Sequence, residues 1–346
     1  RLEAAGSILV LLRAYLKNPH GLDKKSSLER KGENMTQQRK VYLNGKFVPE
    51  TEAKVSIFDS ALMYGDMVFE MTRTFNGTPF RLREHLERLY VGLRILEIDC
   101  GLTIDEMEEA THQTIEINRP CFSEGQDFQI MHDVSRGPLG FYRSIFPPED
   151  AHRTVTINCW PLTWHVGAVA DAYDTGVHAV IPPQQSVPAR LIDPKIKNRS
   201  RVYYQVANQQ VQKVDPKALA LLTDEDGFIT EGTGSNFFIV KDGELFTPEP
   251  RNILRGVTRD AAMDVAADLR INCHERNLEA YDVATADEAF FTTTPFVLLP
   301  ATRFNGLTIG SGAVGPVTHR LLEGWSKMVG VDIIAQAKQC AREVGN

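Results

Sequence analysis

This 346-residue chain lacks features that would mark several classes of protein. No apolar run reaches the roughly 18 residues of a membrane span, so the sequence predicts no membrane contact. The five cysteines are scattered and form no CxxC pair, which excludes a disulfide framework or zinc site and favours a cytoplasmic location. A net charge of -7, without a Lys/Arg stripe interleaved with aromatics, argues against a nucleic-acid partner.

Length and composition are typical of a globular protein with two domains. With 42% hydrophobic and 24% charged residues, the chain can bury a substantial core. Residues 1–34 contain one short apolar run and then a polar segment, so we expect a leader, tag or disordered extension, with Met35 as the natural start. The patterns that follow predict a small α+β domain over 35–163, a linker over 164–173 and a larger α/β domain over 174–346.

Periodicity and turn signals place the main elements. Asn44-Gly45 between two short apolar runs predicts a β-hairpin. Leucines at three- to four-residue spacing predict a helix over 83–96, and a second helix is expected over 104–118. In the second domain we expect helices over 259–270 and 317–327.

The most informative segment runs from Glu231 to Asp260. A lone carboxylate in a Gly/Ser/Thr-rich turn precedes a strand, an Asp-Gly turn and a second strand. Gly256-Val257-Thr258 then opens a helix, where backbone N–H groups, a hydroxyl and the helix dipole suit a phosphate. Pyridoxal 5'-phosphate has a ring nitrogen that pairs with a carboxylate and a phosphate that needs such a cradle. The segment therefore predicts a site for this cofactor.

The same segment resembles the signature of the class IV aminotransferases, the branched-chain and D-amino acid type. The resemblance is carried by Glu231, Thr233, Asn236, Phe237, Phe238, Thr247, Gly256, Val257, Thr258 and Arg259. It extends over about residues 40–330. It implies the D-amino acid aminotransferase-like fold (fold type IV), with the cofactor in the cleft between two domains and at least a homodimer.

A cofactor aldehyde needs a lysine, and the chain offers Lys195 and Lys197. In an extended segment both side chains would point the same way, so the pattern alone does not choose between them. The resemblance favours Lys197, because the reactive lysine of the family lies about ten residues before an alanine of the next helix, here Ala207. The segment is also similar to that of the (R)-selective amine transaminases. Such a lysine must be neutral to act as nucleophile and base.

The resemblance implies further cofactor contacts at Arg88, Arg201, Glu231, Val257, Thr258 and Thr294. Arg88 matches the phosphate-binding arginine of a His-x-x-Arg-Leu helix, and its planar fork suits phosphate oxygens. Glu231 would keep the pyridine nitrogen protonated. Arg201 stands near the place of a tyrosine that contacts the cofactor hydroxyl in branched-chain enzymes.

The expected substrate pocket contains Tyr64, Phe69, Met131, Arg136, Phe141, Arg143, Thr293 and Pro295. Met131 stands where branched-chain enzymes carry an arginine, and Gln129 where they carry a tyrosine. Phe141 stands where D-amino acid transaminases carry a carboxylate-binding arginine, which Arg143 could replace. Pro295 supplies no backbone N–H. The pocket therefore departs from each pattern within the family.

These observations predict a pyridoxal-phosphate-dependent transaminase with a ping-pong mechanism. Branched-chain L-amino acids are the first choice of donor, with 2-oxoglutarate or pyruvate as acceptor. The alternatives are a D-amino acid or (R)-amine transaminase, then an aminodeoxychorismate lyase; an inactive cofactor-binding or structural protein is disfavoured by the presence of the lysine, the glutamate and the arginine. His132 and His165 lack metal-ligand spacing, so we expect core or loop histidines and no metal site.

Overall fold

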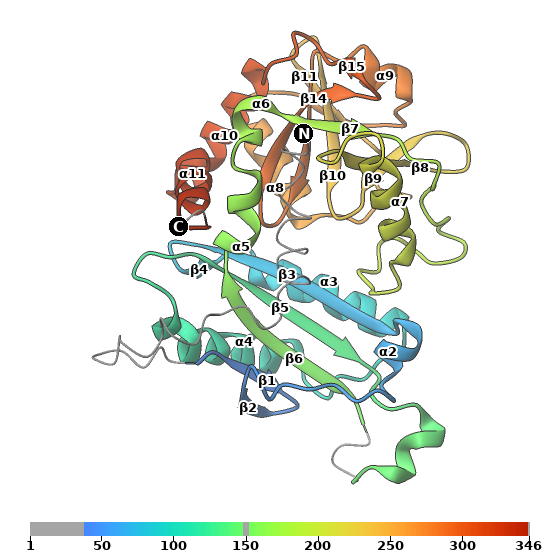
Figure 1. The fold of residues 1–346 in the computed structure, drawn as a ribbon, viewed down its shortest axis with the longest axis vertical. Helices are drawn as coiled ribbons and strands as arrows, with labels where there is room; N and C mark the ends of the chain where they lie inside the picture. The colour runs from blue at the N-terminus through green and yellow to red at the C-terminus, as the bar shows by residue number, and fades with distance from the viewer. Residues whose placement is uncertain (1–37, 148–151, 345–346) are drawn as a thin grey trace, which may run out of the picture.

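The computed structural model describes residues 38–147 and 152–344, and the extension expected over 1–34 lies outside the described residues. Two sheets form two bodies, one above the other in Figure 1. The lower body holds a six-stranded sheet and the upper body a nine-stranded sheet. Among the described residues, no helix combines the length and apolar character needed to cross a membrane.

The six-stranded sheet has the order β2-β1-β6-β5-β3-β4 and is antiparallel throughout. Its strands are β1 Lys40–Leu43, β2 Lys46–Pro49, β3 Met67–Phe75, β4 Thr78–Pro79, β5 Phe128–Ser135 and β6 Thr154–Pro161. The helices of this body are α2 Ser60–Tyr64, α3 Leu82–Ile95, α4 Ile104–Asn118, η1 Arg119–Cys121 and η2 Gly140–Ile145.

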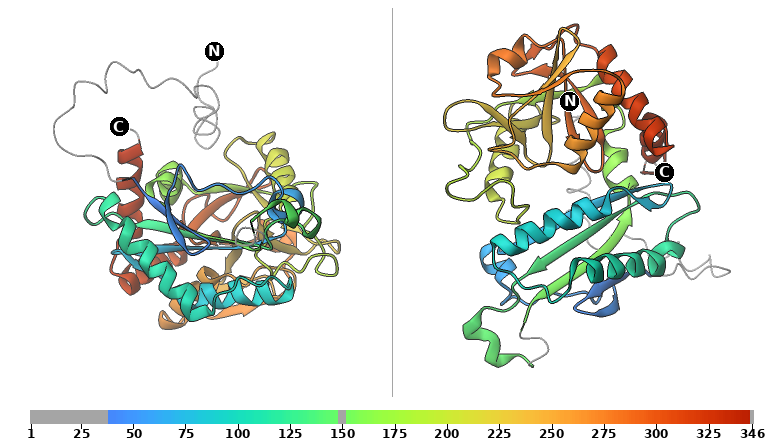
Figure 2. Two further views of the ribbon diagram at one scale, coloured as in Figure 1. Left: turned by 90° about the horizontal axis from the view of Figure 1, so that it is seen from below. Right: turned by 180° about the vertical axis from the view of Figure 1, so that it is seen from behind.

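Local chemistry explains these elements. The predicted hairpin forms because Asn44 and Gly45 take up φ values of 48° and 86°, which a two-residue turn of this kind requires. Helix α4 begins at a capping box in which Thr103 and Glu106 satisfy each other's backbone N–H. Helices α3 and α4 lie across one face of the sheet (Figure 2) and bury an apolar layer against it.

The nine-stranded sheet is mixed, with the order β12-β11-β10-β13-β14-β7-β8-β9 and β15 paired to β14. Its strands are β7 Val177–Val180, β8 Leu219–Thr223, β9 Ile229–Gly232, β10 Asn236–Lys241, β11 Glu244–Thr247, β12 Cys273–Glu275, β13 Glu288–Thr293, β14 Val297–Phe304 and β15 Leu307–Thr308. The helices of this body are α7 Val202–Gln212, α8 Val257–Asp268, α9 Ala280–Ala284, α10 Pro316–Val329 and α11 Ile333–Val344.

Three short helical segments connect the two sheets, where the sequence predicted a linker: α5 Thr163–Val166, η4 Gly167–Val169 and α6 Ala172–Thr175. Helix α11, which the sequence did not predict, packs beside α5 and η4 (Figure 1). Hydrogen bonds also join the bodies: Arg73 Nη1 donates to the Pro295 carbonyl at 2.9 Å. Gln336 of α11 donates to Asp127 at 2.7 Å. The first contact fixes the β13–β14 turn against the small body, and the second fixes helix α11 against it.

Candidate active site

A cavity of about 280 Å³ lies where the two bodies meet. The small body contributes Phe69 and Met71 of β3 and Arg88 of α3 to its wall. The large body contributes the β9–β10 turn, the start of α8 and the end of β13. The cavity is close in size to the lower limit of small-molecule sites, roughly 300 Å³.

The structure brings ten of the sequence-predicted residues together in this wall: Phe69, Arg88, Lys197, Arg201, Glu231, Val257, Thr258, Thr293, Thr294 and Pro295. The other five do not line the cavity of the single chain: Tyr64, Met131, Arg136, Phe141 and Arg143. Arg136 is committed to Asp66 at 2.9 Å and to the carbonyls of Leu96 and Glu97. Phe141 points outward and is 71% exposed.

Backbone hydrogen bonds to β3 set the direction of Lys197. The Phe69 N–H donates to the Lys197 carbonyl at 2.9 Å, and the Arg199 N–H donates to the Met67 carbonyl at 3.0 Å. This short extended stretch turns buried Asn198 away from the cavity and Lys197 toward it, because side chains alternate along a strand.

Lys195 lies outside the cavity. A uniformly extended segment would have aimed it the same way as Lys197, but residues 193–196 form a turn, closed by the Ile196 N–H on the Asp193 carbonyl at 3.0 Å. The Lys195 ammonium pairs with the Asp193 carboxylate at 2.8 Å and donates to the Arg251 carbonyl at 3.0 Å. Of the two lysines, only Lys197 meets the cavity.

The environment of Lys197 favours the neutral amine. Burial, and then the nearby Arg88 guanidinium, lower the pKa of Lys197 to about 7, against 10.5 for an ordinary lysine. The Lys197 Nζ lies over the Phe69 ring, 5.0 Å from its centroid. A neutral amine at this position can act as a nucleophile or as a base near neutral pH.

Glu231 is a buried carboxylate held by three donors. Its oxygens accept from the Tyr204 hydroxyl at 2.8 Å, the Leu254 N–H at 2.9 Å and the Asn236 amide at 3.3 Å. Burial raises the pKa of Glu231, and these donors only partly oppose that effect. Among the described residues, no cation forms an ion pair with this carboxylate. A cationic group bound in the cavity would therefore stabilise the ionised form of Glu231.

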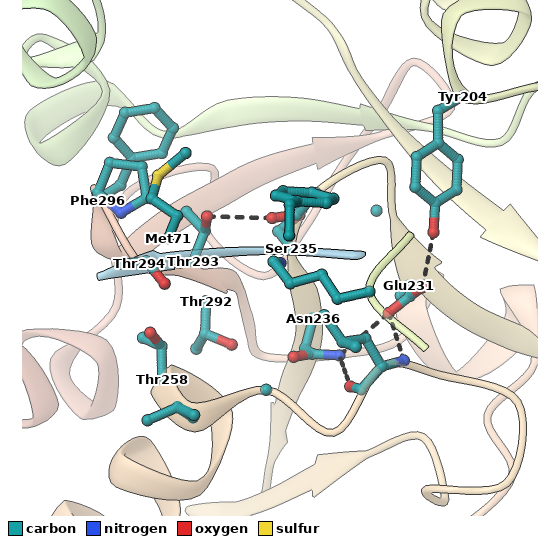
Figure 3. Close-up of a pocket in the computed structure, with 18 of the residues that line it drawn as sticks. Met71, Tyr204, Glu231, Ser235, Asn236, Thr258, Thr292, Thr293, Thr294 and Phe296 are labelled. Atoms are coloured by element: carbon teal, nitrogen blue, oxygen red, sulfur yellow. Dashed lines mark hydrogen bonds between the residues drawn. The ribbon is translucent and has the colours of Figure 1, made fainter. Parts of the chain in front are cut away.

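Hydroxyl groups and the N-terminus of helix α8 lie on the side of the cavity opposite Glu231, which we call the anion side. In Figure 3, Thr258, Thr292 and Thr294 lie on one side of the pocket and Glu231 lies on the other. Thr258 belongs to the first turn of the 12-residue helix α8, where backbone N–H groups and the dipole attract anions. The Thr292 hydroxyl is buried without a hydrogen-bond partner among the described residues. This side therefore suits an anion rich in acceptor oxygens.

Arg88 is held in place beside that anion site. Its Nε and Nη2 donate to the two oxygens of buried Glu70 at 2.6 and 2.8 Å, and its Nη1 donates to the Arg255 carbonyl at 2.7 Å. Burial acts to raise the pKa of Glu70, but Arg88 and then His85 hold it well below its usual range. The ionised Glu70 carboxylate and the Arg255 carbonyl fix the guanidinium near the start of α8.

Sequence reasoning missed several residues of the wall. Tyr204, on the helix after the lysine, supports Glu231, and no local pattern indicates that contact. His165 was expected in the core or a loop, but it lines the cavity. Its Nδ1 hydrogen-bonds to Gln129, which also accepts from the Trp160 indole N–H at 2.7 Å. Burial lowers the pKa of His165, which favours the neutral ring.

A lysine, a carboxylate and an anion-binding helix terminus surround one cavity between the two sheets. Together they define the active site of an enzyme with this two-sheet fold. The sequence profile of the amino-transferase class IV family matches residues 67–304. The chain belongs to this family, and the fold predicted for it is confirmed.

Individual relatives agree with this assignment. A putative branched-chain-amino-acid aminotransferase of Methanocaldococcus jannaschii is 36% identical over 287 residues, which cover 82% of this chain and 94% of that protein. A D-alanine aminotransferase of Bacillus licheniformis is 28% identical over 284 residues, covering 82% and 94%. A T.th. branched-chain amino acid aminotransferase, solved with pyridoxamine 5'-phosphate, superposes with a TM-score of 0.74 at 29% identity and covers 85% of this chain and 95% of its own.

Proposed function

We propose that this chain moves an amino group between an amino acid, branched-chain L-amino acids first, and a 2-oxo acid such as 2-oxoglutarate or pyruvate. The observation that carries the proposal is Lys197 in a cavity bounded by Glu231 and by the N-terminus of α8. Pyridoxal 5'-phosphate, when bound, would supply the aldehyde that takes up the amine and the ring that withdraws electrons from the substrate Cα.

The residues of the cavity fit this cofactor. The unpartnered Thr292 hydroxyl, Thr258, Thr294 and the backbone N–H groups of Val257 and Thr258 would hold the phosphate. Arg88 adds a fixed positive charge on that side. Glu231 would pair with a protonated ring nitrogen, and this cation would add to the charges of Arg201 and Lys197, which already act to lower the pKa of Glu231.

The chain's own groups then act on protons. With the cofactor bound, the Lys197 amine would accept the proton that leaves the substrate Cα. In the cofactor-free site, burial and Arg88 lower the pKa of Lys197 to about 7, which favours the neutral amine that this role needs. The Glu231 carboxylate, held by three donors, would keep the ring nitrogen of the bound cofactor protonated. The two half-reactions give ping-pong kinetics.

We further propose a homodimer in the cytoplasm, in which the loop 136–143 reaches the neighbouring site. Exposed apolar side chains on α2, on η2 and just before α2 support this: Ile57, Leu62, Tyr64, Phe141 and Ile145. Segment η2 projects from the small body (Figure 1). A second copy that covers these elements would remove large apolar side chains from water.

A D-amino acid or (R)-amine transaminase is the second candidate, followed by an aminodeoxychorismate lyase. The D-alanine aminotransferase relative supports the D-amino acid alternative. The residues at the positions of the family's carboxylate arginines, Met131 and Phe141, do not distinguish these substrates.

A donor panel tests the proposal. The purified protein, loaded with pyridoxal 5'-phosphate, is assayed with L-leucine, D-alanine and (R)-1-phenylethylamine, each with 2-oxoglutarate and with pyruvate. We expect the highest turnover with L-leucine. Turnover with D-alanine or the amine alone would select the second candidate, and pyruvate release from aminodeoxychorismate would identify the lyase. A protein that acquires no visible lysine–cofactor absorption band would refute the enzyme proposal.

A further inference from the structure

Arg201 places a guanidinium at the cavity wall without a carboxylate partner. Its Cζ lies 4.9 Å from the Phe69 ring centroid and 5.1 Å from that of Tyr204. Among the described residues, no hydrogen bond or ion pair of this side chain is formed. Contacts with ring faces orient a guanidinium but leave its charge and its N–H donors available.

The neighbouring arginines are already committed. Arg88 is bound to Glu70 and to a carbonyl on the anion side of the cavity. Arg199 packs on the same ring as Arg201, with its Cζ 3.7 Å from the Phe69 centroid, but it is paired with Asp133 at 2.8 Å and does not line the cavity. Arg143, the sequence candidate for a carboxylate contact, donates to the Pro138 carbonyl at 3.3 Å and lies outside the wall.

The β13–β14 corner offers few donors for a carboxylate. Pro295 has no backbone N–H. The Thr293 hydroxyl already donates to the Gly234 carbonyl at 3.1 Å. The hydroxyls of Thr258, Thr292 and Thr294 belong to the anion side. A substrate carboxylate therefore finds its strongest donor at Arg201.

We propose that Arg201 binds the α-carboxylate of the amino acid and of the oxo acid. The proposal deepens the transaminase function and rests on it: the substrates are α-amino acids and 2-oxo acids, and amines that lack a carboxylate are poor substrates. It also gives Arg201 a role toward the substrate instead of the cofactor hydroxyl contact that the resemblance implied. A guanidinium–carboxylate pair in an enclosed site is strong and can be bidentate.

A bound carboxylate also changes the charge seen by Lys197. The Arg201 guanidinium is one of the groups that lower the pKa of Lys197, although burial and Arg88 contribute more. In the loaded protein, the colour change of the lysine–cofactor band reports the nitrogen that joins Lys197 to the cofactor. A carboxylate bound beside that nitrogen favours its protonated form and should move the colour change upward in pH. Arg201→Gln should need a higher carboxylate concentration to show the same shift.

The test uses the cofactor-loaded protein and two probes of similar shape, 4-methylpentanoate and its neutral amide. Dissociation constants come from the change in the absorption band. The wild type should bind the carboxylate more tightly and show the upward shift. Arg201→Gln should weaken carboxylate binding at least about tenfold, as expected for the loss of one charge-assisted contact, and leave amide binding unchanged. Arg201→Lys should retain part of the preference.

Arg199→Gln is the matched control, since Arg199 packs on the same ring but is already paired. It should keep the preference for the carboxylate. Two results would show that Arg201 is a cofactor or structural residue and that the proposal is wrong. In the first, Arg201→Gln weakens the binding of both probes equally. In the second, it lowers cofactor affinity but leaves the preference for the carboxylate over the amide intact. Circular dichroism checks folding of the variants. A wild type that forms no lysine–cofactor band overturns the transaminase function and this assignment with it.

Discussion

The lowered pKa of Lys197 gives the most direct test of the site. An ordinary lysine with a pKa of 10.5 has roughly one neutral amine in 3,000 at pH 7. A pKa of about 7 leaves about half of the Lys197 amines neutral at the same pH. The site should therefore raise the neutral fraction at pH 7 by about three orders of magnitude.

The assay follows capture of pyridoxal 5'-phosphate by the cofactor-free protein. The visible absorption band is recorded after rapid mixing at pH values from about 5.5 to 10. Only the neutral amine attacks an aldehyde, so the capture rate should rise with pH through about 7 and then level off. Lys197→Ala should abolish the band.

Lys195→Ala is the matched control, because Lys195 is paired with Asp193 outside the cavity. It should leave both the band and its pH profile unchanged. Two results would refute the reasoning: a capture rate that still climbs near pH 10, as for an unperturbed lysine, or a band that is lost in Lys195→Ala and retained in Lys197→Ala.

Two further substitutions test the support around the site. Glu70→Gln removes the charge that holds Arg88. It should lower the free energy of unfolding, measured by urea denaturation, by roughly 3 kcal/mol, as expected when one partner of a buried ion pair is lost. Unchanged stability would show that the ion pair between Glu70 and Arg88 does not stabilise the fold. Gly256→Ala places a methyl group 2.1 Å from the Asn236 amide oxygen, so we expect a loss of about 1–3 kcal/mol and weaker cofactor binding by equilibrium dialysis. Unchanged stability together with unchanged cofactor affinity in Gly256→Ala would contradict the steric argument.

Strong local signals made much of the fold predictable from the sequence. The helix predicted over 104–118 is α4, because its apolar spacing and its capping box lie within one segment. The hairpin at Asn44-Gly45 was equally local. Helix α11 was missed although its sequence carries a local signal, with helix-favouring residues and Ile333, Ala337 and Cys340 at helical spacing. Only the tertiary structure shows that this apolar face packs beside α5 and η4.

For the site, the sequence by itself determined the candidate cofactor-binding groups, since each of them sits in a short ordered motif: Glu231 in its turn, Thr258 at a helix start and Arg88 in its helix. The resemblance favoured Lys197 of the two lysines. The tertiary structure decided that Lys197 lines the cavity and Lys195 does not, because a turn at 193–196 and the bonds of Lys197 and Arg199 to β3 set their directions. It also decided the contacts of Tyr204, His165 and Arg201. Their contacts join segments far apart in the chain, and whether an arginine is neutralised or available depends on partners that spacing does not encode.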